Sequence, residues 1–127
     1  MISGIGTDIV EVARVDRIYQ KYKLRFISKI LSPEDILKLK DSDVPLQLAN
    51  HFAVKEATVK ALGTGFRAGI YPPSIHLRYD HLGKPIIKVK DRVADLFQKK
   101  GITDAHVSIS HDGGLILAFV VLERSPT

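Results

Sequence analysis

The sequence contains no cysteine. This absence excludes disulfide bonds, thiolate metal sites and cysteine nucleophiles, and it fits the reducing cytoplasm, where we expect the protein to work. The sequence also lacks any apolar stretch of the roughly 18 residues that a transmembrane helix needs. Its amino terminus lacks the basic-then-apolar pattern of a signal peptide. We therefore expect no membrane association.

Length and composition are those of one globular domain. The chain has 127 residues and 45% of them are hydrophobic, so we expect residues 1–127 to form a single domain around one core. The formal net charge is +5. This surplus favours an acidic protein partner or a phosphorylated substrate, although it would also serve simple solubility.

Hydrophobic periodicity predicts an α+β domain with an antiparallel sheet. Ser32 and Pro33 are typical of a helix start, and Gly63 is typical of a helix end. The helices are expected over residues 11–22, 33 to about 40, 45–62 and 91–100, and the strands over residues 2–10, 74–79, 85–90, 105–110 and 115–123.

Two carboxylates occur in unusual settings. Asp8 lies in residues 4–10 (GIGTDIV), and Glu56 lies in residues 52–57 (FAVKEA). A charge within a mostly apolar or small-residue run is costly to bury unless another group pairs with it. Carboxylates beside lysines and glycines indicate a Mg²⁺ ion that holds a phosphorylated substrate. For Asp8 a helix cap is the alternative, although Thr7 would fill that role as well.

Along the expected long helix, Ala49, Ala53, Glu56 and Lys60 fall on one stripe. A carboxylate on this small-residue face can reach a metal that touches another element, and Lys60 can meet a phosphate beside it. The spacing leaves open a solvent-facing Glu56–Lys60 pair, worth roughly a few tenths of a kcal/mol.

Two further segments suit phosphate contact. Gly63, Thr64 and Gly65 form a turn that can offer backbone N–H groups, although a plain C-cap explains a glycine at this position more simply. On the expected strand, His106 and Ser108 share one face with a second serine. The alternative for His106 is a strand histidine without a function.

The start of the chain is basic, with Arg14, Lys21 and Arg25 and an aromatic residue, Phe26, among them. Such a surface suits an acidic protein or RNA, or it is merely a solvated helix face. The usual aromatic signature of RNA-binding proteins is missing, so we expect no nucleic acid partner.

Three motifs together, residues 4–10, residues 52–57 with 60–65 (KALGTG), and residues 106–111 (HVSISH), resemble those of the holo-acyl-carrier-protein synthases. These are the small 4′-phosphopantetheinyl transferases, and residues 83–85 (GKP) also fit. The resemblance implies their fold, a long central helix packed on a small antiparallel sheet. It implies transfer of 4′-phosphopantetheine from coenzyme A to a serine of apo acyl carrier protein, with release of adenosine 3′,5′-bisphosphate, in fatty acid biosynthesis.

The resemblance also implies the site residues. Asp8 and Glu56 would hold Mg²⁺ against the pyrophosphate and, with Lys60, form the catalytic set. The base that takes the serine proton would be Glu56 or a metal-bound water, and the residues leave both open. The implied coenzyme A contacts are Lys60, Gly63, Thr64, Gly65, His106 and Ser108, and the implied carrier-protein contacts are Arg14, Lys21, Arg25 and Phe26.

One departure from the family concerns His51. Many members have arginine immediately before the FAVKEA-type motif, where it would serve the 3′-phosphate of coenzyme A. A histidine is charged only when its pKa allows. We therefore expect His51 to contribute a pH-dependent part of the affinity for coenzyme A, or another basic residue to have taken its role.

The resemblance further implies a homotrimer with active sites between subunits. Two other classes stay open from the residues. One is a Mg²⁺-dependent phosphohydrolase of nucleotides or coenzyme A, which would act without a protein acceptor. The other is a non-enzymatic binding module that uses the basic helix, with an affinity that falls steeply with salt.

Overall fold

The computed structural model describes residues 1–126. Its elements in chain order are β1 (Ile2–Glu11), α1 (Val12–Tyr22), α2 (Leu24–Ile30), α3 (Pro33–Lys38), α4 (Val44–Leu62), the 3-10 turn η1 (Pro72–Ser74), β2 (Ile75–Tyr79), β3 (Pro85–Val89), α5 (Asp91–Lys100), β4 (Ile102–Asp112) and β5 (Leu115–Arg124). In this part of the chain, no helix has the length and hydropathy of a membrane span.

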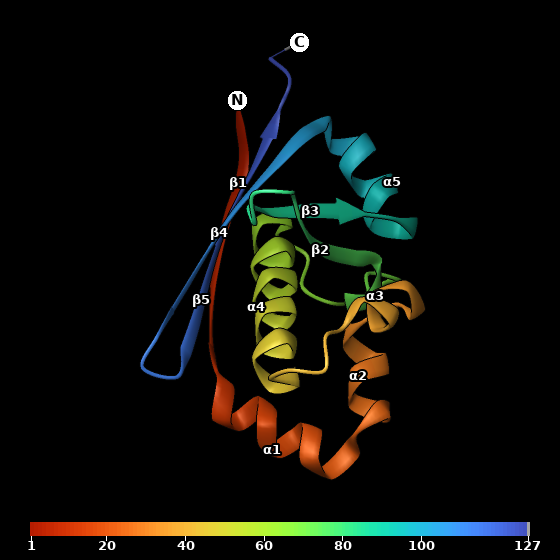
Figure 1. The fold of residues 1–127 in the computed structure, drawn as a ribbon. Helices are drawn as coiled ribbons and strands as arrows, with labels where there is room; N and C mark the ends of the chain where they lie inside the picture. The colour runs from red at the N-terminus through yellow and green to blue at the C-terminus, as the bar shows by residue number, and fades with distance from the viewer. Residues whose placement is uncertain (127) are drawn as a thin grey trace.

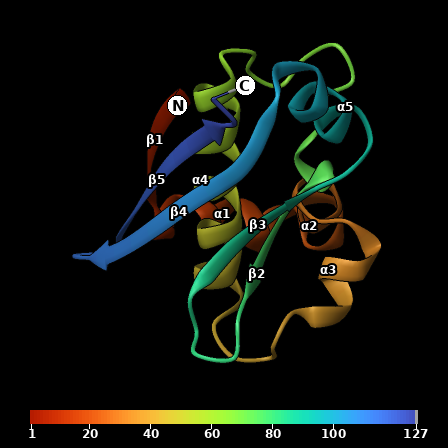
Figure 2. The same ribbon diagram turned by 90° about the horizontal axis from the view of Figure 1, so that it is seen from above.

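The strands form two antiparallel sheets on opposite sides of the long helix α4. One sheet has the order β1-β5-β4, and the other is the β2–β3 hairpin. Figures 1 and 2 show α4 between the three-stranded sheet and the side formed by β2, β3, α2 and α3. The α+β class and the central helix expected from the sequence are confirmed.

Alternating residues divide the three-stranded sheet into two faces. Ile116, Ala118, Val120 and Leu122 of β5 are fully buried and point toward α4. Their neighbours along the strand point the other way and stay partly exposed. This is the period of two that a strand imposes on its side chains. The inner face supplies the core, whereas the outer face is exposed in one chain and is mainly apolar on β1 and β5.

Helix α4 is buried on several sides, as expected of a helix in the middle of a domain. Leu48, Ala53 and Val54 are among its residues with no exposed surface. Asp43 caps the start through its side chain, which accepts a hydrogen bond from the Leu46 N–H at 3.2 Å. Gly63 ends the helix with φ of +80°, a conformation that glycine adopts without strain.

Two glycines allow β1 to lie directly on α4. A Cβ atom at Gly6 would be 2.0 Å from the carbonyl oxygen of Ala57, and one at Gly4 would be 1.9 Å from that of Ala61. No side chain fits at either position. Gly4 lies at Ala61 and Gly6 one turn earlier at Ala57, so Asp8, two residues beyond Gly6 on the same strand face, lies beside the middle of α4, where Glu56 is.

The structure adds two details to the expected elements. Helix α2 follows α1 after Lys23, whose φ of 48° breaks the helical path. Its short apolar pattern, with Ile27 and Ile30 buried, gave no separate helix signal. Strand β4 begins at Ile102 rather than at residue 105, because a register irregularity between Ile102 and Asp104 extends its pairing with β5.

Candidate active site

Asp8 and Lys60 form an ion pair between β1 and α4. The Lys60 Nζ lies 3.0 Å from Asp8 Oδ1 and also donates to the Thr7 carbonyl oxygen at 3.0 Å. The Asp8 side chain is 15% exposed, whereas that of Lys60 is 52% exposed. Asp8 is inside a strand, and Glu11 is the residue at the start of α1, so the helix-cap alternative does not apply.

Glu56 is the second carboxylate of this site. Burial raises its pKa above the usual value, the negative charge of Asp8 raises it further, and the positive charge of Lys60 opposes both. Asp8 and Glu56 line the same cavity of about 490 Å³. Glu56 and Lys60 of α4 are therefore not an isolated, solvent-facing pair, because they form a group of three charges with Asp8 of β1.

These carboxylates suit a magnesium ion that is also bound by its substrate. Oxygen atoms are the ligands that Mg²⁺ prefers, and protein sites often supply only one or two carboxylates while phosphates and water supply the rest. Among residues 1–126 no group of three His, Cys, Asp or Glu side chains is placed to hold a metal. Asp8 and Glu56 thus fit Mg²⁺ together with phosphate oxygens.

The cavity beside the carboxylates has apolar walls. Val15 and Ile18 of α1, Phe26 of α2 and Phe52 of α4 line it, and Arg14 lies at the same cavity. A ligand with a mainly uncharged arm and an anionic group that binds a cation held by the carboxylates would match this division between carboxylate and apolar surface. The basic residues of α1 and α2 are exposed next to it, with Lys21 and Arg25 both close to the Tyr22 ring.

In the turn formed by Gly63, Thr64 and Gly65, two of the three backbone N–H groups cap α4, and one buried hydroxyl has no partner among the described residues. The N–H groups of Gly63 and Thr64 donate to the Val59 carbonyl oxygen, at 3.0 and 3.1 Å. Helix capping therefore accounts for these two N–H groups, as the plain C-cap interpretation of the sequence predicted. The Thr64 Oγ1 is buried without a hydrogen-bond partner among the described residues, so it is the polar group that a ligand would satisfy.

His106 and Ser108 lie on the opposite face of the sheet from Asp8. Both are exposed on β4, where His106 Nε2 is 3.0 Å from Glu123 Oε1. Ser108 is paired in register with Phe119, whose side chain is also on the outer face. Within one chain, the structure does not bring these two residues to the carboxylates.

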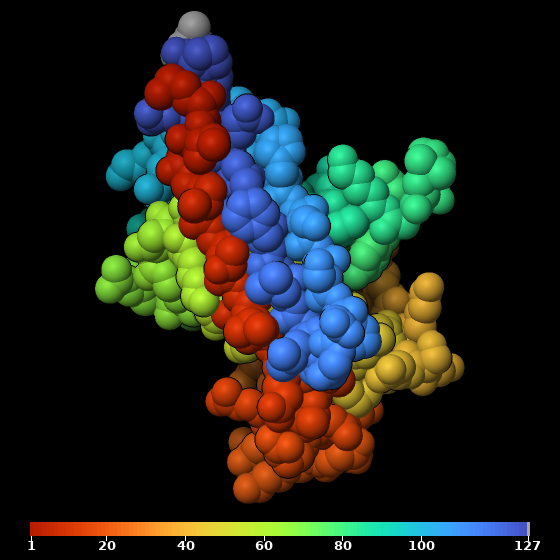
Figure 3. Space-filling model, turned by 90° about the vertical axis from the view of Figure 1, so that its left-hand side faces the viewer, coloured from red at the N-terminus to blue at the C-terminus, as the bar shows by residue number. Residues whose placement is uncertain are grey.

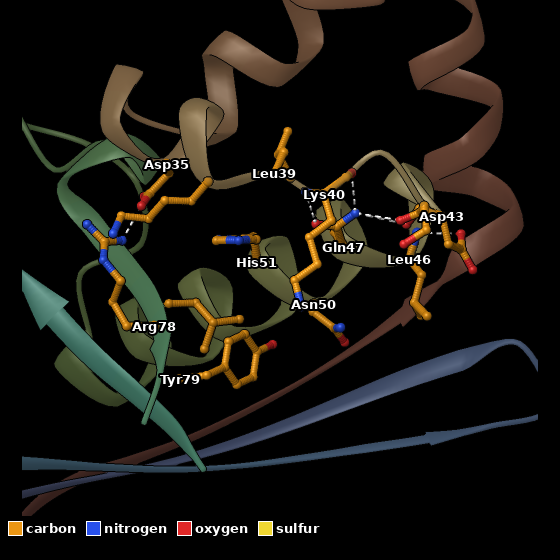
Figure 4. Close-up of a pocket in the computed structure, with 13 residues that line it drawn as sticks. Asp35, Leu39, Lys40, Asp43, Leu46, Gln47, Asn50, His51, Arg78 and Tyr79 are labelled. Carbon is orange, nitrogen blue, oxygen red and sulfur yellow. Dashed lines mark hydrogen bonds and ion pairs between the residues drawn. The ribbon is translucent and has the colours of Figure 1, made fainter. Parts of the chain in front are cut away.

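His51 faces another cavity, of about 480 Å³, between α4, α3 and β2 (Figure 4). Burial, together with the positive charge of Lys55, lowers its pKa to about 4, so the imidazole is neutral near pH 7. Its Nδ1 has no hydrogen-bond partner among the described residues. Lys40 and Arg78 line the same cavity and carry the positive charge that His51 lacks.

The sequence interpretation missed a buried charged group behind the site. Lys55 has no exposed surface and donates from Nζ to the Pro72 carbonyl oxygen at 2.9 Å and to that of Ile75. Burial lowers the pKa of Lys55 to about 7, and the negative charge of Asp35 opposes this change. The sequence did contain a signal of this burial, because Lys55 falls on the same helical stripe as the apolar residues Phe52, Val59 and Leu62.

Asp35 is the centre of a second missed interaction. The residue is 2% exposed, and its carboxylate lies 2.8 Å from His76 Nδ1 and accepts a hydrogen bond from Arg78 Nη1. Ser32 caps the same turn by accepting from the Asp35 N–H. The interaction joins α3 to β2 in the wall of the His51 cavity, which Asp35 and Arg78 both line, and its residues carried no motif in the sequence.

A family model described as the 4′-phosphopantetheinyl transferase superfamily matches residues 4–120. The chain belongs to this superfamily. The holo-[acyl-carrier-protein] synthase of Desulfovibrio desulfuricans is 43% identical and is covered over 98% of its length by 97% of this chain. That of Halothermothrix orenii is 44% identical, with 98% of this chain and 99% of the relative covered.

Solved structures of the superfamily have the same fold. The holo-[acyl-carrier-protein] synthase of Neisseria meningitidis superimposes with a TM-score of 0.90 at 38% identity, covering 98% of this chain and all of that chain. The Helicobacter pylori enzyme, solved in complex with coenzyme A, gives a TM-score of 0.81 at 32% identity, with 94% and 99% covered. The resemblance seen in the motifs thus extends over the fold.

Proposed function

We propose that this protein is a holo-acyl-carrier-protein synthase, which transfers 4′-phosphopantetheine from coenzyme A to a serine of apo acyl carrier protein in fatty acid biosynthesis. The observation that carries the proposal is the convergence of Asp8, Glu56 and Lys60 beside an apolar cavity. Membership of the superfamily supports the same reaction. A plain binding module would not need two carboxylates placed against each other.

The reaction forms one phosphorus–oxygen bond and breaks another. The serine oxygen attacks the phosphorus next to the pantetheine arm, and adenosine 3′,5′-bisphosphate leaves with the electrons of the broken bond. The serine proton passes to Glu56 or to a water beside it. Lys60 and the Thr64 hydroxyl would bind phosphate oxygens, and the apolar cavity would take the arm. Mg²⁺ held by Asp8, Glu56 and the pyrophosphate would neutralise charge on the leaving oxygens.

The outer face of the large sheet supports a homotrimer with sites between subunits. Ile5, Ile9, Leu117 and Phe119 are each 42–61% exposed on that face, which Figure 3 shows as β1, β5 and β4 side by side. Large exposed apolar patches mark interaction surfaces. His106 and Ser108 lie on the same outer face, so in such an assembly they would lie at the contact with another subunit, and we propose that they complete the site of that subunit.

The acidic carrier protein would bind along α1 and α2. Arg14 and Phe26 lie at the cavity that holds Asp8, and Lys21 and Arg25 continue the basic surface away from it. An acidic partner on this surface would place its serine near the carboxylates. Charge complementarity of this kind mainly accelerates association and fixes register. The cytoplasmic location expected from the sequence stays a prediction.

The decisive experiment is the intact mass of an apo acyl carrier protein after incubation with this protein, coenzyme A and Mg²⁺. We expect a gain of one phosphopantetheine group that chelator prevents and that Asp8→Asn and Glu56→Gln abolish. Lys99→Ala, at an exposed position on α5, is the matched control and should leave the gain unchanged. Consumption of coenzyme A without any mass gain would instead indicate the phosphohydrolase.

A further inference from the structure

A fully buried lysine precedes Glu56 on the central helix. Lys55 has no exposed surface, although lysine is among the residues that proteins bury least often. Its ammonium group has lost its hydration, which is unfavourable unless strong hydrogen bonds replace it. The mechanism above gives Lys55 no contact with substrate, so a different role must account for it.

The hydrogen bonds of Lys55 join α4 to the corner between η1 and β2. The Nζ donates to the carbonyl oxygens of Pro72, at 2.9 Å, and Ile75. On a different side of the same helix, Gly4 and Gly6 hold α4 against β1. The helix is thus fixed between two sheets, by backbone contact toward β1 and by an ammonium group toward β2 (Figures 1 and 2).

We propose that Lys55 is a positioning residue, which fixes the orientation of Glu56 toward Asp8 through helix α4. Successive side chains on an α-helix project about 100° apart, so the direction of Lys55 determines that of Glu56. The negative charge of Asp8 acts on Glu56 more strongly than the positive charge of Lys60 does, so the remaining repulsion favours a movement of α4 that separates the two carboxylates. The Lys55 hydrogen bonds oppose that movement. The inference rests on the proposed function, because it requires Glu56 to be a metal ligand.

The test compares two neutral substitutions on the same helix. Lys55→Met keeps most of the apolar length and removes the ammonium group. Thr58→Val is the matched control, since Thr58 is equally buried but its hydroxyl donates to Val54 within the helix, at 2.7 Å. Each variant is assayed for transfer to apo acyl carrier protein. Mn²⁺ binding is followed by electron paramagnetic resonance with coenzyme A present and carrier protein absent, and folding by circular dichroism.

We expect Lys55→Met to fold, to lose at least about tenfold in kcat, and to bind Mn²⁺ about tenfold more weakly. Thr58→Val should match the wild type in both respects, even if its thermal midpoint falls. A folded Lys55→Met with wild-type kcat and Mn²⁺ affinity would overturn the proposal. So would an equal loss of Mn²⁺ affinity in Thr58→Val, which would show a general effect of core substitutions.

A second variant covers the case in which Lys55→Met does not fold. Lys55→Gln is shorter and neutral, so it keeps a hydrogen-bond donor but not the charge or the full reach of lysine. A partial loss of Mn²⁺ affinity in this variant supports the proposal, and an unchanged affinity contradicts it. If the wild-type protein neither modifies the carrier protein nor binds Mn²⁺, the proposed function fails first, and the role of Lys55 fails with it.

Discussion

The Lys60 ammonium group lies 3.0 Å from the Asp8 carboxylate, although the two residues are 52 positions apart in the chain. This pairing depends on the distance between β1 and α4, which the glycines of β1 set. Because Gly6 has no side chain, the strand backbone can approach the Ala57 carbonyl oxygen directly. The geometry of the charged groups is thus determined by a contact that involves no charge.

Substituting Gly6 with alanine should separate the charged groups. The added Cβ would lie 2.0 Å from the Ala57 carbonyl oxygen, so β1 and α4 must move apart. We expect the free energy of unfolding to fall by about 1–3 kcal/mol, as for other overpacked cores. Transfer activity should fall about 100-fold, because a displacement of about 1 Å can have this effect. Urea unfolding measures the free energy of unfolding, and the mass assay measures the transfer activity. Ser3→Ala is the control for both.

His51 should contribute no pH-dependent affinity near neutral pH. Its pKa of about 4 keeps it uncharged there, so the structure favours the alternative that another basic residue serves the 3′-phosphate. The ratio of KM for coenzyme A between His51→Ala and wild type should be constant from about pH 6 to pH 8. Lys40→Ala, in the same cavity, should raise KM throughout that range. A ratio that changes with the titration of a group near pH 6.5 would restore the pH-dependent role of His51.

Asp35 should make the protein sensitive to acid. Burial raises the pKa of its carboxyl, but the hydrogen bond from His76 and the charges of His76 and Arg78 outweigh this, so the net pKa lies below 3.8. The unfolded chain therefore takes up the proton first as pH falls. The resulting stabilisation is present above about pH 4 and is lost as pH falls through the folded-state pKa.

Asp35→Asn tests this assignment. It leaves Arg78 with a weaker partner in a buried site, so the free energy of unfolding at pH 7 should fall by about 3 kcal/mol or more. The variant should also lose the part of the acid dependence that Asp35 supplies below about pH 4. Chemical denaturation at pH 7 and at pH 3 measures both effects. Equal acid dependence in wild type and variant would assign the sensitivity to other carboxylates.

Local patterns in the sequence predicted the helices and strands and singled out the charged residues of the candidate active site. Glu56 and Lys60 follow helical spacing, and Asp8 and Glu56 are recognisable as charges within mostly apolar or small-residue runs. The groups that the sequence did not reveal depend on distant pairing. Asp35 meets His76 and Arg78 across 41 and 43 residues, and no local rule connects them.

Local patterns in the sequence also could not predict the order of the strands in the sheet. The alternation along β4 correctly placed His106 and Ser108 on one face, but it could not say whether this face was the one toward Asp8. That relation follows from β5 lying between β1 and β4, with α4 covering one side. The structure places these two residues on the other side. Their predicted contact with coenzyme A then requires a second chain.

The apolar outer face should be the contact between subunits. Phe119 is 42% exposed at the centre of β5, and aspartate there would put a charge into a buried interface. We expect Phe119→Asp to remain folded, to become monomeric by light scattering, and to lose transfer activity although its carboxylates are intact. Leu37→Asp, on α3 and 88% exposed, should stay trimeric and active. An active Phe119→Asp monomer would show that one chain suffices.

Mixing two inactive variants tests the shared site directly. Glu56→Gln removes a carboxylate, and His106→Ala removes a group that we assign to the neighbouring subunit. If one site needs Glu56 from one chain and His106 from the next, random trimers co-expressed in equal amounts should have both groups intact in about one quarter of their sites. Activity should therefore recover to about that fraction of wild type. If both groups act within one chain, no mixed trimer contains a complete site made from the two variants, and activity should stay at the level of the single variants.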